Sequence, residues 1–156
     1  MKLNKSEVRA KGFFRIQIEE NGKIVGNSGW RKNQVTNLGF LNYLVLAIGA
    51  SAGSKQIGFV GLGTGAAPAS NATTLPGEIT DKREAVTFGS VGSTTAQFTA
   101  TFASSDSFLA GASNLSNIGL FAATTSNDTL FAGNTYASSS CGTNQNVNVT
   151  YQIRFS

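Results

Sequence analysis

The chain has 156 residues, enough for one domain around a single hydrophobic core and too few for two ordinary domains. Hydrophobic residues make up 40% and charged residues only 13%, with a formal net charge of +4, so the sequence is that of a globular protein whose surface is coated mainly with small polar side chains. Histidine is absent and there is one cysteine, which removes the commonest general base and excludes an internal disulfide.

The N-terminal segment is the most strongly charged part of the chain. We predict a basic arm over residues 1–10, followed by a single β-sandwich domain over residues 11–156. The predicted interface residues are Lys2, Lys5, Arg9, Lys11, Trp30, Arg31 and Lys32. Such a charge suits an acidic partner surface, and a solvated flank is the alternative. We identify no aromatic-interleaved basic cluster or nucleic-acid motif beside it, so no specific readout of nucleic acid is expected. The arm has no apolar centre, so no signal peptide is expected.

A β-hairpin is predicted from Lys11 to Ser28. Apolar and polar residues alternate along GFFRIQIEE, with Phe14 and Ile16 on the apolar face, as in a half-buried strand. Asn21-Gly22 follows, and this dipeptide is the strongest short-range hairpin signal because both residues tolerate a positive φ.

One helix is predicted, from Leu38 to Ile48. Its apolar residues recur at helical spacing, Thr36 or Asn37 can cap its start, and Gly49 can end it. Because the segment is apolar almost throughout, we expect the helix to be buried in the core or at an interface.

Glycine-rich sequence follows the helix. The run QIGFVGL over residues 56–62 predicts a central strand that another backbone approaches closely, and residues 63–77 predict a long loop. The letters GLGTGA from Gly61 match a dinucleotide fingerprint, but a proline-containing loop follows where that motif needs a helix, so we interpret these glycines as tight turns. Residues 78–84 are predicted to form a solvated, charged bend.

The rest of the chain has the pattern of β-strands. Residues 96–102 and 147–155 alternate strictly between apolar and polar side chains, and shorter apolar runs lie at 115–121 and 129–132. We therefore predict a mainly β protein, a β-sandwich or jelly-roll-like fold of about seven or eight strands with one short buried helix.

The sequence contains few candidate catalytic or metal-binding residues. Glu78, Asp81 and Glu84 are close enough in sequence to hold a hard cation such as Ca²⁺, but they lack the spacing of a calcium loop and are interpreted as a surface charge cluster. Cys141 is expected to be a buried or inert thiol. We therefore predict no catalytic, cofactor-binding or metal-binding residues, no enzymatic activity and no membrane span.

Several short motifs, in this order, resemble those of small virion structural proteins of tailed bacteriophages. They are NQVTNLG (33–39) leading into a helix, VGLGTG (60–65) followed by an Ala/Pro/Thr-rich loop, IGLF (118–121) followed by LFA (130–132), and the closing alternating strand (147–155). The resemblance covers most of the chain from Trp30 onward. In that pattern the residue before IGLF is often acidic, whereas here it is Asn117. The resemblance implies a particle component without catalysis.

Three functions follow from these observations as hypotheses. The first is a capsid decoration or cement protein in a virion, made in the host cytoplasm, that forms homo-oligomers and binds the major capsid protein or other virion proteins. The second is a tail, baseplate or fibre component, with loop 63–77 or the Ser/Thr-rich segment 136–143 facing a partner or host surface. The third and most remote is a carbohydrate-binding module or a hydrolase, for which Glu78 and Glu84 are the candidate carboxylates.

Overall fold

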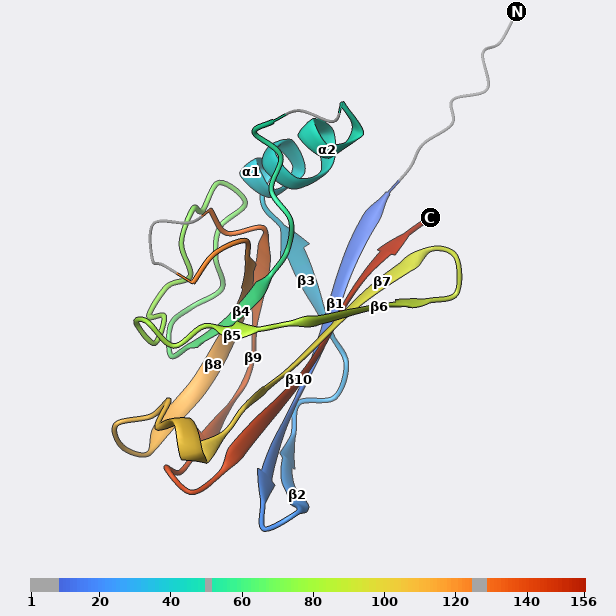
Figure 1. Ribbon diagram of the computed structural model, residues 1–156. Coiled ribbons are helices and arrows are strands. Elements are labelled where there is room, and N and C mark those ends of the chain that lie inside the picture. The colour runs from blue at the N-terminus through green and yellow to red at the C-terminus, as the bar shows by residue number, and fades with distance from the viewer. Residues whose placement is uncertain (1–8, 50–51, 125–128) are drawn as a thin grey trace, which may run out of the picture.

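Antiparallel β-strands dominate the computed structural model, which describes residues 9–49, 52–124 and 129–156 (Figure 1). The strands within these ranges are β1 (Ala10–Glu20), β2 (Lys23–Asn27), β3 (Arg31–Val35), β4 (Phe59–Gly63), β5 (Glu84–Ala85), β6 (Thr87–Val91), β7 (Thr95–Phe102), β8 (Ser113–Phe121), β9 (Ala132–Cys141) and β10 (Asn146–Phe155). They join in the order β5-β4-β8-β9-β3-β1-β10-β7-β6, and β2 pairs with β1 outside this path.

Two segments turn the sheet back on itself. β3 pairs with β1 through residues 31–33 and then with β9 through Gln34 and Val35. β5 pairs with β4 and β6 pairs with β7, although only Val86 separates β5 from β6. The two ends of the sheet are therefore consecutive in sequence, and the sheet is nearly closed into a barrel.

The prediction of a mainly β protein with one short helix is confirmed. The described residues form ten strands where seven or eight were expected, and the nearly closed sheet is not clearly a sandwich or a jelly roll. The physical reason is that β3 and the segment 84–91 each belong to two parts of the sheet, so hydrogen bonding continues around the corners where a sandwich has two separate sheets.

The core fills the inside of this barrel. Phe14 of β1 lies opposite Tyr151 of β10, and both side chains are fully buried with ring centroids 5.8 Å apart. Burial of each large apolar side chain contributes roughly 1.5–3 kcal/mol. The largest fully buried side chains are Tyr151, Phe14, Phe102, Phe121, Phe131, Leu62, Leu115, Ile118, Leu120, Leu130, Val60 and Val147.

The predicted hairpin is confirmed. β1 and β2 pair on either side of Asn21 and Gly22, whose φ angles are +51° and +75°. These left-handed conformations are those that a tight hairpin turn requires, and they explain why this dipeptide stands there. In Figure 1 the turn lies at the end of the barrel away from the helix.

The predicted helix is confirmed in position. It runs through α1 (Asn37–Gly39), the π-helical η1 (Phe40–Val45) and α2 (Leu46–Ile48), and it lies across one end of the barrel (Figure 1). The Thr36 hydroxyl accepts a hydrogen bond from the Gly39 amide at 2.9 Å. A Cβ on Gly39 would lie 2.1 Å from the Phe131 carbonyl oxygen, so close packing requires glycine here.

The expectation that this helix is buried in the core is wrong. Tyr43 is buried, but Phe40, Leu41 and Val45 are 41%, 45% and 56% exposed. The helix covers the open end of a barrel, so only the side that faces the barrel can be buried. None of the helices in the described ranges has the length and apolar content of a membrane span.

Three local expectations also differ from the structure. The apolar run 129–132, expected to be a strand, contributes only Ala132 to β9. The segment 136–143, considered as a recognition surface, is largely part of the same paired strand. Gly61 and Gly63 lie within β4 without positive φ, so they are sites of close contact and not of tight turns. A Cβ on Gly63 would lie 2.4 Å from the Asn117 side-chain oxygen. The bend at 78–84 is not fully solvated, because Arg83 is buried.

Candidate functional site

A cluster of basic and aromatic side chains covers the outer face of the sheet where β3, β1 and β10 pair. Because alternate residues of β1 are buried, Lys11, Phe13 and Arg15 point outward. In register, Lys11 lies opposite Arg154 of β10, and Phe13 lies opposite Lys32 of β3. We name this surface the basic aromatic face, and it consists of Lys11, Phe13, Arg15, Trp30, Lys32 and Arg154.

Cation–π contacts hold this face together. The guanidinium carbon of Arg154 lies 4.4 Å from the ring centroid of Phe13 and 6.0 Å from that of Trp30. The guanidinium carbon of Arg15 lies 5.4 Å from the Trp30 ring. Each such contact contributes about 0.5–1 kcal/mol at an exposed site, and together they fix two positive charges in place.

Arg154, which contacts both rings, is oriented by a neutral amide. Nε and Nη2 of Arg154 donate to the side-chain oxygen of Gln152 at 3.1 and 2.7 Å. The amide nitrogen of Gln152 donates in turn to the Gln97 side-chain oxygen at 2.8 Å. Within the part of the chain that the structure describes, Arg154 forms no ion pair, and the same is true of Lys11, Arg15 and Lys32. These contacts leave the positive charge of the face uncompensated.

A small cleft lies on the same face between β1 and β3. Its volume is about 260 Å³, and Lys11, Phe13 and Lys32 line it together with residues 10, 12 and 33. A drug-sized ligand needs a larger site, from about 300 Å³ upward. Two lysines beside an aromatic ring suit a single acidic side chain of a partner.

The structure brings together part of the predicted interface. Lys11, Trp30 and Lys32 lie on the basic aromatic face, whereas Lys2 and Lys5 lie outside the described residues. The backbone of Arg9 exchanges two hydrogen bonds with Ser156 and so extends the β1–β10 pairing. Arg31 donates from Nε to the Ser28 carbonyl at 2.9 Å, which directs its side chain to the preceding turn.

Sequence reasoning missed three members of this face, namely Phe13, Arg15 and Arg154. The alternation in both strands places them on the polar side, but only the pairing of β1 with β10 brings Arg154 onto Phe13. The expectation that the chain has no basic cluster with interleaved aromatic residues is wrong, because Phe13 and Trp30 lie among the basic side chains of this face.

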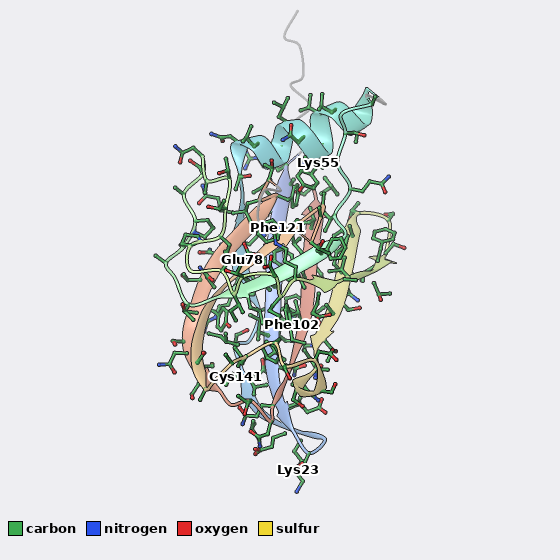
Figure 2. All side chains as sticks on the ribbon, turned by 60° about the vertical axis from the view of Figure 1, so that its left-hand side comes forward. Lys23, Lys55, Glu78, Phe102, Phe121 and Cys141 are labelled. Carbon is green, nitrogen blue, oxygen red and sulfur yellow. The ribbon has the colours of Figure 1, made fainter. Side chains whose placement is uncertain are left out.

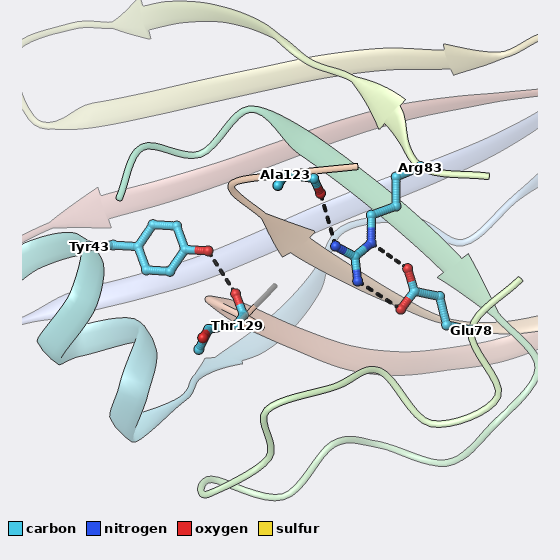
Figure 3. A network of polar contacts seen from close by, with 5 residues as sticks. All are labelled: Tyr43, Glu78, Arg83, Ala123 and Thr129. Carbon is cyan, nitrogen blue, oxygen red and sulfur yellow. Dashed lines mark hydrogen bonds and ion pairs between the residues drawn. The ribbon is translucent and has the colours of Figure 1, made fainter. Parts of the chain in front are cut away.

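A second polar cluster lies inside the molecule, around Arg83. Its Nε and Nη2 donate to the two carboxylate oxygens of Glu78 at 2.5 and 3.1 Å, and Nη1 donates to the Ala123 carbonyl at 2.9 Å (Figure 3). The guanidinium carbon lies 3.4 Å from the ring centroid of Phe121. Arg83 is only 8% exposed, so this is a buried, bidentate ion pair that connects the 78–84 segment to the end of β8.

The remaining titratable groups with shifted pKa values are explained by burial. Burial raises the pKa of the Cys141 thiol, which is fully buried as predicted, and also the pKa values of the Tyr136 and Tyr151 phenols. Burial, followed by the nearby charge of Asp106, raises the pKa of the Glu84 carboxyl. No group of three potential metal ligands occurs among the described residues.

Loop 63–77 is tied to the barrel beneath it. The buried side-chain amide of Asn117 donates to the carbonyls of Ala66 and Pro76 at 3.0 and 2.7 Å, and the Ser116 hydroxyl donates to the Gly65 carbonyl at 2.9 Å. Both partners of Asn117 are acceptors, so an acidic residue at this position would have no proton to donate to them when ionised. Leu75 is buried as well, which fixes the loop at its far end.

Comparison of this chain with protein families, with curated proteins and with solved structures gives no match. The functional argument therefore depends on the chain's own residues and their geometry.

Proposed function

We propose that this chain is a non-enzymatic structural protein that binds an acidic protein surface through its basic aromatic face, as a decoration protein on the capsid of a tailed bacteriophage. The observation that carries the proposal is the group of fixed cations on this face. Arg15 and Arg154 lie over Trp30, Arg154 also lies over Phe13, and neither arginine is paired with a carboxylate in the described structure. Positive charge that is held in place without a counter-ion favours a complementary acidic partner.

The aromatic rings of this face favour a protein partner over nucleic acid. Proteins that bind single strands stack bases on open aromatic rings. Here the Arg154 guanidinium lies against Phe13 and near Trp30, and Arg15 lies over Trp30. These rings therefore orient cations, whereas a base needs a free ring face.

The particle context is supported by the resemblance of the motifs and by the composition of the remaining surface. From Ala85 to Ile153 only Asp106 and Asp128 are charged. The free-energy cost of removing small hydroxyl and amide groups from water is lower than that of removing ions. Such a surface therefore suits packing against neighbouring subunits. The major capsid protein or another virion protein is the proposed partner.

The candidate catalytic groups are engaged in structural contacts. The Glu78 carboxylate is bound by Arg83, and the Cys141 thiol is buried. Glu84, the other carboxylate of the hydrolase hypothesis, lies in β5 opposite Val60 of β4. This arrangement supports a structural role over glycoside hydrolysis, which needs two available carboxyl groups across a cleft.

The tail or fibre hypothesis depends on loop 63–77 or on segment 136–143 as a recognition surface. Loop 63–77 is fixed to the barrel by Ser116 and Asn117, and most of segment 136–143 is paired in β9. Both segments are held in place along part of their length, whereas recognition of a host surface favours a free loop tip. The geometry therefore supports the decoration role better.

The experiment that tests this proposal is binding of the purified chain to particles that lack it. Lys11→Glu and Lys32→Glu are each compared with Lys23→Glu, which changes the net charge equally at the hairpin tip, far from the helix in Figure 2. We expect the two variants of the face to bind at least about tenfold more weakly, and wild-type binding to weaken as salt rises. Equal binding by all three variants, or tighter retention on nucleic acid than on particles, would contradict the proposal.

A further inference from the structure

β6 is an exposed strand at the end of the sheet. It pairs with β7 on one side, and no other strand of the described residues pairs with its second side. All five of its residues are exposed. Phe88, at 66%, is the most exposed of the large hydrophobic side chains described, and Val91 is 48% exposed. Each edge strand presents backbone N–H and C=O groups that can pair with a further strand.

This edge lacks the features that prevent strands from pairing between molecules. Proteins protect exposed edges with lysines, prolines or bulges, yet β6 has the sequence TFGSV and the chain has no charged residue from Ala85 to Ser105. The whole chain carries +4, so two copies repel each other least where the surface is uncharged. A second copy is therefore a better match for this edge than for the basic aromatic face.

We propose that two copies of this chain associate through their β6 strands, in antiparallel register about a two-fold axis at Gly89. An antiparallel two-fold pair joins identical edges and leaves neither of them open, so association stops at the dimer. All five residues overlap only when Gly89 lies opposite Gly89 of the second copy. In this register Thr87 lies opposite Val91 and Phe88 lies opposite Ser90.

The register covers the most exposed apolar group of the described chain. Phe88 lies diagonally across from the Phe88 of the second copy, a separation within reach of aromatic side chains. Both rings lie on the side of β6 where Phe88 contacts the buried Phe98 at 5.7 Å between ring centroids. On that side a hollow of about 410 Å³, lined largely by apolar residues that include Leu44, Ile57 and Phe131, leaves room for apolar packing.

Pairing through β6 also has a consequence for the outer face of the sheet. The two-fold axis relates the two copies, so the dimer carries two basic aromatic faces. Two linked contacts bind more tightly than one when both are engaged. The dimer itself does not depend on the proposed capsid partner.

Sedimentation of the purified full-length chain over a range of concentrations tests this dimer. We expect wild type to be dimeric and Thr87→Lys/Val91→Lys to dissociate at least about tenfold more readily, because it places lysines opposite each other at two symmetric positions. Thr87→Lys/Val91→Glu places each lysine opposite a glutamate and should restore the dimer. Val25→Lys/Asn27→Lys adds the same charge on exposed residues of β2 and should remain dimeric.

Both substituted positions in β6 are exposed, so we expect every variant to fold. Circular dichroism checks this for each variant. The proposal is overturned if wild type is monomeric at every concentration up to its solubility limit. It is equally overturned if Thr87→Lys/Val91→Lys and Thr87→Lys/Val91→Glu associate alike, because that equality excludes the register centred on Gly89.

Discussion

At the scale of single residues, the buried ion pair between Arg83 and Glu78 makes the fold sensitive to the loss of either partner. Arg83 lies on the ring of Phe121 and donates to the carboxylate and to the Ala123 carbonyl (Figure 3). A buried pair of this kind contributes little compared with apolar residues of the same shape. Removal of one partner is costly, however, because the other charge remains buried without compensation.

Arg83→Met is therefore expected to lower the free energy of unfolding by about 3–5 kcal/mol. Glu78→Gln/Arg83→Met removes both charges and should recover part of that loss. Denaturant unfolding of wild type and both variants measures these differences. A double variant no more stable than Arg83→Met alone would show that packing, and not the unpaired carboxylate, accounts for the loss.

At the scale of elements, the helix depends on the contacts of Thr36, the residue that caps its N-terminus. The buried Thr36 hydroxyl accepts from the Gly39 amide and donates to the Leu130 carbonyl at 2.6 Å. Tyr43, about two turns beyond Thr36, donates to the Thr129 carbonyl at 2.7 Å (Figure 3). Both contacts join the helix to the segment that leads into β9, so the cap positions the whole element on the barrel.

Thr36→Val keeps the shape of this side chain and removes its hydroxyl. We expect a loss of about 1–2 kcal/mol in the free energy of unfolding, because the first turn of the helix loses its cap. Thr36→Ser keeps the hydroxyl and serves as the control, with a smaller loss. Equal losses in thermal or denaturant unfolding would assign the effect to the methyl group and would contradict the capping role.

The elements that the sequence predicts are those with strong local signals. The alternation in β1, β7 and β10 reflects one buried face, and Asn21-Gly22 specifies the hairpin turn. β3, with the sequence RKNQV, and the fully exposed β6 have no such pattern, because cross-strand pairing and not a buried face holds them. The sequence does not predict the exposed side of the helix. Apolar spacing looks the same for a helix buried in the core and for a helix that covers a barrel end with one side open to solvent.

At the scale of the whole molecule, the stability of the fold should fall in alkaline solution. Burial raises the pKa values of Cys141, Tyr136 and Tyr151 above those of the unfolded chain. The folded state therefore keeps protons that the unfolded state releases. This contribution is fully present below the unfolded pKa values, about 8.5 for Cys and 10 for Tyr, and is lost as the pH rises above them.

Denaturant unfolding from pH 7 to pH 10 measures this effect, and we expect the free energy of unfolding to decline from about pH 8.5 upward. Cys141→Ala should flatten the decline between about pH 8.5 and 10, whatever its effect on stability at pH 7. An unchanged slope in that variant would show that the thiol ionises in the folded chain as easily as in the unfolded one.

The basic aromatic face also belongs to this scale, because it exists only in the assembled sheet. Trp30 and Lys11 could be selected from the sequence as interface residues, since they lie in its basic N-terminal part. Arg154 could not, because it is more than a hundred residues away and reaches Phe13 only through the pairing of β1 with β10. Strand order and register are set by the whole core, so sequence patterns in single strands do not contain them.

Cryo-electron microscopy of the particle that contains this chain tests the central claim most directly. The account predicts density for the chain in a regular array on the capsid, with Lys11, Trp30 and Arg154 of the basic aromatic face against an acidic patch of the shell. Density confined to the tail, or an array in which this face points to solvent, would contradict it.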